Sequence, residues 1–227
     1  RLAIFQMPIF CFLLLVVFSR PIWADECEQL PKPSVTVKLI EDSLTFNTQY
    51  SYKSLNNIGA GLARPGQQVL GLPRGNAIVR FSASTATYLD RAGRWECASP
   101  QLVLSVGYSP MTVYVAREFP EGSCAYKEIY EHELRHVKAY QSHLKAIEKV
   151  LAETLNQRFA TGAPWRGPGG QTVASIQRGL DERWIPYVKR ELGRVDAAQA
   201  LIDTPEEYAR VAGSCGGEIK KGMRGVP

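Results

Sequence analysis

The sequence predicts an α+β fold, in which a mostly antiparallel, twisted sheet packs on one long helix and a second helix runs antiparallel to the first. Two observations support this prediction. Residues 34–115 contain short runs with the two-residue alternation of strands, whereas residues 125–202 show the three- and four-residue spacing of amphipathic helices. Strands followed by helices, without regular alternation of the two, are typical of α+β domains.

The first residues have the pattern of a secretory signal peptide. An almost wholly apolar run covers residues 4–18, and small or apolar residues lead up to Ala24, directly before the acidic Asp25. The run is short for a membrane span, and no later segment approaches about 20 continuous apolar residues. We therefore expect residues 1–24 to be cleaved and residues 25–227 to form a single secreted or periplasmic domain without stable membrane insertion. An uncleaved anchor is the alternative.

The charge balance argues against nucleic acid as a partner. The 227 residues carry a net charge of +5, which falls to +3 when Arg1 and Arg20 leave with the signal segment. No run of five basic residues is present, so the electrostatic pattern of a nucleic-acid-binding protein is missing. The sequence does not predict an oligomeric state.

Four cysteines follow the signal segment. An even number in an exported chain predicts two disulfides, with buried free thiols as the alternative. Three connectivities are possible. We favour Cys97–Cys124 together with Cys27–Cys215, which would tie the two ends of the mature chain together.

The strand-rich half contains several extended runs. Residues 34–40 and 44–52 come first, and residues 76–89 resume the strand pattern after a stretch rich in Gly and Pro that predicts loops. Residues 102–106 and 111–115 are apolar runs joined through Gly107-Tyr108-Ser109-Pro110. This pair predicts a β-hairpin.

The helical half begins with a segment that lacks Gly and Pro over residues 125–160, which predicts one long helix with Ser123 as its N-cap. A second helix is expected from about residue 171 to about residue 202, bent at Pro186. The sequence Thr204-Pro205-Glu206-Glu207 is a capping box with Pro at the first helical position, so it predicts a short last helix.

The long helix carries an unusual cluster of polar residues. His132 and His136 lie one turn apart, and Glu133 interrupts a stripe that is otherwise apolar. Burying a carboxylate costs several kcal/mol unless it is paired, so its position requires a reason. Two imidazoles at this spacing can converge on one Zn²⁺, and the adjacent glutamate can take a proton from water at the metal. The alternative is an accidental match on an amphipathic helix.

The segment His132-Glu133-Leu134-Arg135-His136 resembles the zinc-binding helix of the zincin metallopeptidases. With strands before this helix, paired cysteines and an export signal, the chain also resembles a family of bacterial secreted proteins described as zinc-dependent proteases. The resemblance implies a zincin-like fold, bound Zn²⁺ and a peptide or protein substrate held by β-addition at an edge strand, for which Met111–Arg117 is our candidate. Arg135 and Lys138 depart from the uncharged residues usual around the motif, but both fall on the polar side of the helix.

A zinc centre requires a third protein ligand. His143 is the remaining histidine, but on an unbroken helix it lies about 10 Å along the axis from His136, so we expect it at the edge of the buried face. If the second helix packs antiparallel, Glu191 and Asp196 bracket the level of His136. We favour Glu191, then Asp196, and the alternative for each is a surface ion pair with a neighbouring arginine.

The sequence therefore predicts a secreted zinc-dependent metallohydrolase, in the simplest case a peptidase. His132 and His136 hold Zn²⁺, Glu133 is the general base, and Tyr140 is a candidate for stabilising the oxyanion. The alternative is a catalytically inactive zincin-fold protein that has a binding or structural role in the cell envelope. A third possibility is a helix that binds no metal.

Overall fold

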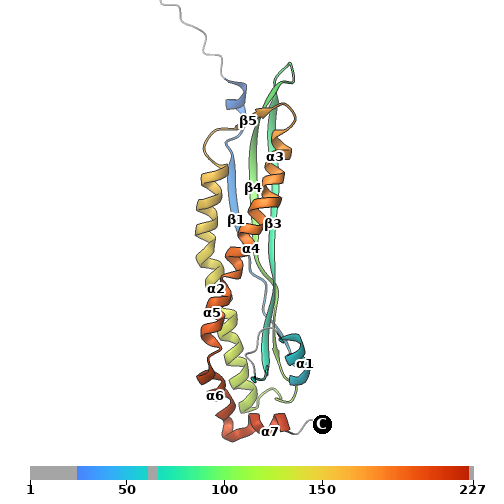
Figure 1. Cartoon of the computed structure of the whole chain (residues 1–227), viewed down its shortest axis with the longest axis vertical. Helices are drawn as coiled ribbons and strands as arrows, with labels where there is room; N and C mark the ends of the chain where they lie inside the picture. The colour runs from blue at the N-terminus through green and yellow to red at the C-terminus, as the bar shows by residue number, and fades with distance from the viewer. Residues whose placement is uncertain (1–24, 61–65, 225–227) are drawn as a thin grey trace, which may run out of the picture.

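The computed structural model describes residues 25–60 and 66–224, and the predicted signal peptide lies outside them. The molecule is elongated (Figure 1). Two long strands run along its axis, and the long helix α2 lies beside them together with a chain of shorter helices. The 3-10 helix η1 (Glu26–Gln29) and the last helix α7 (Glu218–Arg224) lie at opposite ends.

The sheet is built around β4 (Trp95–Val115), a continuous strand of 21 residues. On one side β3 (Gly71–Leu89) pairs with β4 in the antiparallel direction. On the other side three short strands pair with successive parts of β4: β5 (Trp165–Pro168) antiparallel, then β1 (Ser34–Ile40) and β2 (Thr45–Asn47) parallel. The α+β class is confirmed, but the sheet is mixed rather than mostly antiparallel.

The predicted hairpin at Gly107–Pro110 is wrong, because residues 102–115 continue in one strand. Gly107 serves a close strand contact instead of a turn: a Cβ there would lie 2.5 Å from the carbonyl oxygen of Ile40 in β1. The observed turn joins β3 to β4, where the Asp90 side chain accepts hydrogen bonds from the backbone N–H of Ala92 and Trp95.

The prediction that Met111–Arg117 forms an edge strand is also wrong. Residues 112–114 pair with β2 on one side and with β3 on the other, so both edges of this segment are occupied. The Gly- and Pro-rich stretch 57–75, predicted as loops, begins with the last two residues of α1 (Tyr52–Ile58) and ends with the first residues of β3. Among the described strands, β3 pairs with β4 alone and is therefore an edge strand.

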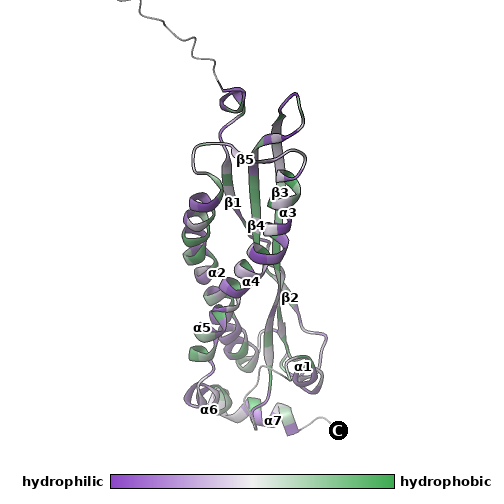
Figure 2. Cartoon of the chain, turned by 45° about the horizontal axis from the view of Figure 1, so that its top comes forward, coloured by the Kyte–Doolittle hydropathy of each residue, from purple (hydrophilic) through white to green (hydrophobic). Residues whose placement is uncertain are grey.

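The core lies between the sheet and α2 (Cys124–Phe159). Alternate residues of β4, including Leu102, Leu104 and Val106, are buried. Hydrophobic residues follow β4 in Figure 2, whereas α2 shows both hydrophobic and hydrophilic surfaces. The Ser123 hydroxyl caps α2 by accepting from the backbone N–H of Tyr126 at 3.0 Å, which confirms the predicted start of this helix.

The second helical stretch runs over residues 172–202 as α3 (Thr172–Gly179), a π-helical turn (Leu180–Trp184), α4 (Ile185–Gly193) and α5 (Val195–Ile202). The π-helical turn ends just before Ile185 and Pro186, which lacks a backbone N–H, so the irregularity falls where the bend was predicted.

The last helices follow this stretch. The predicted start of the last helix is confirmed, because the Thr204 hydroxyl accepts from the backbone N–H of Glu207 at 3.1 Å and opens α6 (Pro205–Gly213). The return bond of a capping box is replaced, since the backbone N–H of Thr204 donates to the carbonyl of Ile202 at 3.0 Å. A 3-10 turn, η3 (Cys215–Gly217), then leads into α7. No helix in residues 25–60 and 66–224 is long and apolar enough to cross a membrane.

All four cysteines form disulfides, as predicted, but the favoured connectivity is wrong. The bonds are Cys27–Cys97 and Cys124–Cys215. Parallel pairing of β1 with β4 starts with Ser34 opposite Gln101, so the segment before β1, with Cys27, lies at the same end as the start of β4, with Cys97. Cys215 follows α6 at the opposite end of the molecule. The two disulfides indicate an oxidising compartment outside the cytoplasm.

Candidate metal centre

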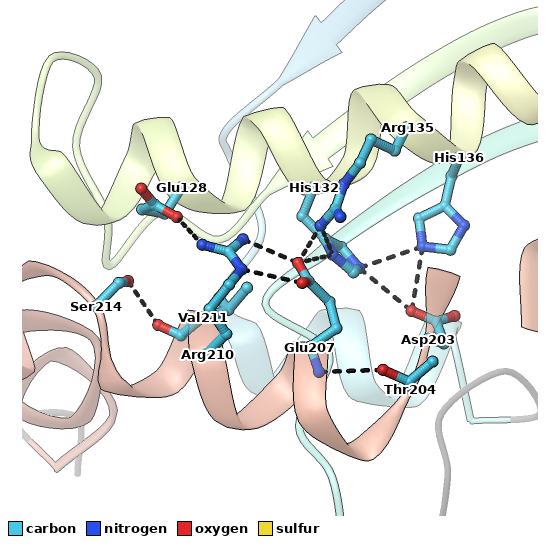
Figure 3. Close-up of polar contacts among 10 residues, drawn as sticks. All are labelled: Glu128, His132, Arg135, His136, Asp203, Thr204, Glu207, Arg210, Val211 and Ser214. Carbon is cyan, nitrogen blue, oxygen red and sulfur yellow. Dashed lines mark hydrogen bonds and ion pairs between the residues drawn. The ribbon is translucent and has the colours of Figure 1, made fainter. Parts of the chain in front are cut away.

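Three side chains converge on one point beside α2 (Figure 3). The Nε2 atoms of His132 and His136 lie 3.2 Å apart, and Oδ1 of Asp203 lies 3.2 Å from the first and 3.1 Å from the second. A tetrahedral ion with bonds of about 2.0 to 2.1 Å holds its ligand atoms about 3.3 to 3.4 Å apart. The triangle therefore has nearly the size that a small cation requires, and the three residues form a possible metal site.

The outer nitrogen of each imidazole has its own acceptor. Nδ1 of His136 donates to Oε1 of Gln199, whose Nε2 in turn donates to the His136 carbonyl oxygen at 3.2 Å. Nδ1 of His132 lies 3.2 Å from Oε1 of Glu207 and 2.9 Å from a guanidinium nitrogen of Arg135, so it faces both an acceptor and a donor. With the proton of His136 on Nδ1, this ring presents the lone pair of Nε2 to the common centre, which is the arrangement found around metal-bound histidines.

Glu207 is itself held in place by two arginines. Its Oε1 accepts from Arg135, and its two oxygens accept from Arg210 at 2.9 Å each. These bonds, first that from Arg210, outweigh partial burial and hold the pKa of Glu207 well below its usual range. Although Glu207 is the last residue of the predicted capping box, its carboxylate lies against His132. The carboxylate beside His132 is therefore ionised and held in a fixed orientation.

The electrostatics of the group suit a cation. Burial lowers the pKa of His132 and His136, but hydrogen bonds to Asp203 and the charge of Glu133 outweigh it, so both are raised. Burial raises the pKa of Asp203, but its hydrogen bonds to the two histidines outweigh that effect and lower it. The two imidazoles thus lie beside carboxylates, whose negative charge favours a positive charge at this position, such as that of a metal ion.

Glu133 is 5% exposed and faces the same space as the triad. Burial raises the pKa of Glu133 to about 7, against the opposing effect of the two histidines. Gly71, the first residue of β3, makes room for it: a Cβ there would lie 2.6 Å from both Cγ and Oε1 of Glu133. The neighbouring charges act on it in both directions: those of His132, His136 and Arg135 lower its pKa, and that of Asp203 raises it.

A cavity of about 780 Å³ opens beside these groups. It lies between the segment 66–73 and helices α2, α5 and α6. Its walls are largely apolar, and no Lys or Arg is among the described residues that line it. The apolar lining residues include Val69, Leu72, Ile129, Ala200, Val211 and Met223. Concave, mostly apolar sites with a few convergent polar groups are typical of ligand-binding sites.

The structure does not place any of the three predicted third ligands with the histidine pair. Nε2 of His143 donates to the backbone carbonyl of Glu191 at 2.7 Å, so this histidine holds α2 against α4. The Glu191 carboxylate pairs with Arg194 at 3.1 Å, as the surface-pair alternative had it, although Glu191 is buried. Asp196 lines the cavity but does not belong to the group that can hold an ion.

The register of the second helical stretch explains this miss. We assumed that the helices meet directly across the loop 160–171, but residues 165–168 of this loop form β5 and pair with the start of β4. The following helix therefore begins beyond the end of α2, and Phe159 packs on Trp184, with ring centroids 5.5 Å apart. This displacement brings Gln199 and Asp203 to the level of His136, in place of Glu191 and Asp196.

One sequence signal pointed toward the missing ligand. Asp203 directly precedes Thr204, the N-cap of α6, and Glu207 is the last residue of the same capping box. A helix start flanked by two carboxylates, after a helix expected to pack on the motif, marked a place where acidic groups approach the histidines. Gln199 had no comparable signal.

Tyr140 also lines the cavity. Its ring packs edge-on against Tyr108, with centroids 4.7 Å apart, and the Tyr108 hydroxyl donates to the carbonyl of Leu192 at 2.9 Å. Burial raises the pKa of Tyr140, so its hydroxyl keeps its proton at neutral pH. Tyr208 of α6 lines the same cavity, with its ring centroid 6.2 Å from that of His132. The Tyr140 hydroxyl is therefore a candidate donor to a ligand.

In comparisons with known proteins, the chain matches no family model, no curated protein and no solved structure. The resemblance to zincins thus depends on the motif of α2 and on the geometry around it.

Proposed function

We propose that this protein is an exported zinc-dependent metallohydrolase that cleaves peptide bonds. The observation that supports this most directly is the pairing of a triangular His132–His136–Asp203 group with a buried carboxylate, Glu133, that faces the same cavity. Two imidazoles and one carboxylate are a ligand set used by catalytic zinc, which keeps its fourth position for water or substrate.

Zn²⁺ held by these three residues would supply a Lewis acid and lower the pKa of a water molecule in its open position to about 7. The chain's own residues perform the remaining tasks. Gln199 and Glu207 fix the ring orientations of His136 and His132. Glu133, with its pKa raised to about 7, accepts the proton of the attacking water and returns it to the leaving amine.

The start of β3 is the edge on which we place an extended substrate. It borders the cavity, its Gly71 adjoins Glu133, and its outer edge pairs with no other described strand. A peptide that adds to this edge would place its backbone across the cavity by main-chain hydrogen bonds. This assignment replaces the segment Met111–Arg117.

The test is a zinc measurement followed by a single substitution. Protein exported by its host and purified without chelators should contain about one zinc per chain. It should hydrolyse unfolded casein or an internally quenched peptide. Glu133→Gln should keep the zinc and lower the rate by about 10²- to 10⁴-fold, which is the usual contribution of a general base.

Two outcomes would contradict the proposal in different ways. Protein without bound zinc, even after addition of zinc, would leave α2 as a structural helix. Zinc retained without hydrolysis of any peptide, and with no difference between wild type and Glu133→Gln, would favour the inactive binding or structural protein of the cell envelope.

A further inference from the structure

Four of the contacts between α2 and the segment 203–215 follow one another along α2 at intervals of one helical turn. Residues 124, 128, 132 and 136 share one side of α2, because positions four apart lie above one another. In order from the start of α2, the pairs are Cys124 with Cys215 through the disulfide, Glu128 with Arg210 at 2.7 Å, His132 with Glu207 at 3.2 Å and His136 with Asp203 at 3.1 Å. Figure 3 shows the three polar pairs side by side. We call this set of four pairs the clasp.

The helix that carries the clasp has little hydrophobic attachment. Of the nine residues of α6, Val211 alone is buried, and it is 9% exposed. The Arg210 side chain is 50% exposed, and exposed ion pairs contribute about 0 to 1 kcal/mol each. Hydrophobic packing therefore contributes little to the positions of Asp203 and Glu207. These positions depend on the polar contacts and the disulfide of the clasp.

The covalent pair lies at a joint in the backbone. Cys215, Gly216 and Gly217 all have positive φ, at 56°, 60° and 84°. Glycine adopts this conformation readily, whereas a residue with a side chain does so at a cost of about 1 to 2 kcal/mol. Beyond the joint, α7 is anchored by the fully buried Ile219. The disulfide therefore fixes the joint between α6 and α7 directly against the first residue of α2.

We propose that the Cys124–Cys215 disulfide positions Asp203 and Glu207, so that the site retains its metal only after this bond has formed. The inference rests on the metal site of the proposed function, but not on peptidase activity. Closing the bond removes two electrons and two protons from the two thiols and passes them to a disulfide oxidant, which becomes a dithiol. In a reducing compartment the clasp lacks its covalent pair and the metal is held weakly. After export the site becomes complete.

The experiment compares zinc affinities, measured by competition with a chromophoric chelator, for the wild type and two double variants. Cys124→Ser/Cys215→Ser removes the clasp disulfide, and serine prevents free thiolates from capturing zinc. Cys27→Ser/Cys97→Ser is the matched control. Its bond spans 70 residues against 91 and lies at the other end of the sheet, so the loss of chain constraint is similar.

The expected result is a fall of about 10- to 100-fold in the zinc affinity of the first variant, comparable with the loss of an outer-sphere partner of a metal ligand. The control variant should bind zinc as the wild type does. Treatment of the folded wild type with a phosphine reductant, which unlike a dithiol brings no thiolates to compete for zinc, should release zinc in step with reduction of Cys124–Cys215.

A second variant keeps the inference testable if the first fails to fold. Arg210→Ala removes the neighbouring pair with Glu128 and loosens Glu207 while the disulfide stays closed; zinc affinity should fall several-fold. Arg178→Ala, an exposed arginine on α3, is its control. Wild-type protein without zinc would refute the proposed function itself. If the wild type binds zinc and Arg210→Ala binds it with the same affinity, and if the disulfide variant or the reduced protein does so too, the proposal about the clasp is refuted while the proposed function stands.

Discussion

The two halves of α2 bury different kinds of residue on the same side of one helix. The N-terminal half buries His132, Glu133 and His136 among its apolar residues. The residues buried in the C-terminal half are all apolar: Leu144, Ile147, Leu151, Leu155 and Phe159. A disulfide lies near each end of the sheet, but Cys124–Cys215 alone joins α2 to another element.

The difference shows how a buried polar group reveals a functional site. In the C-terminal half, removal of apolar surface from water accounts for the pattern, at about 25 cal/mol per Å². In the N-terminal half three ionisable side chains are buried at a cost in free energy, and Gln199 and Glu207 lie against the two imidazoles. Packing alone would favour three apolar residues at these positions.

Replacing the third ligand should have the largest effect on the site. Asp203→Ala should lower zinc affinity by more than about 100-fold, the upper range for losing an outer-sphere partner, because a direct ligand is lost. Glu191→Ala and Asp196→Ala are the controls and should retain zinc in the same chelator competition. A loss of zinc in either control, with Asp203→Ala unaffected, would return the third ligand to the second helical stretch.

A substitution in the apolar half should act on stability alone. Leu151 is fully buried, so Leu151→Ala should lower the free energy of unfolding by about 2 to 5 kcal/mol in denaturant titrations. Zinc affinity of the folded fraction should not change. Altered affinity would mean that the two halves of α2 are coupled more closely than their contacts indicate.

A substitution beside Glu133 should have a smaller effect than the loss of a ligand. Gly71→Ala places a methyl group 2.6 Å from the Glu133 side chain, so the carboxylate must move while the three ligands remain. Hydrolysis should fall by about 10- to 100-fold, as for other displacements of about 1 Å in an active site, with zinc retained. Gly179→Ala is the control, because a Cβ there meets nothing within 4 Å. Equal activity in the two variants would remove Glu133 from the mechanism.

The pH dependence of stability gives the smallest effect. The folded pKa of Glu133, about 7, lies above the ordinary value of 4.5. The folded protein therefore holds this proton more tightly than the unfolded chain, and the contribution of Glu133 to stability is lost as pH rises between these values. In metal-free protein, Glu133→Gln should weaken this decline by up to about 2 kcal/mol between about pH 5 and about pH 7. Identical slopes in denaturant titrations would show that Glu133 is not desolvated.

Features that depend on residues close in sequence could be predicted well. The start of α2 at Ser123, the cap of α6 at Thr204 and the common side of α2 shared by His132, Glu133 and His136 all follow from helical geometry over one or two turns. The predictions that failed required pairing over long separations. The disulfide partner of Cys27 depends on the parallel pairing of β1 with β4. The identity of the third ligand depends on how far β5 shifts the following helices along α2.

The sequence by itself determined an α+β chain with an amphipathic helix that presents two imidazoles and a carboxylate at metal-binding spacing, because this information is contained in local periodicity and side-chain chemistry. The tertiary structure alone decided that Asp203 meets those imidazoles, that Gln199 and Glu207 orient them, and that Cys215 fastens this segment to Cys124. These contacts depend on how the strands and helices pack against one another. A small shift of one helix along another changes which carboxylate lies beside the two histidines.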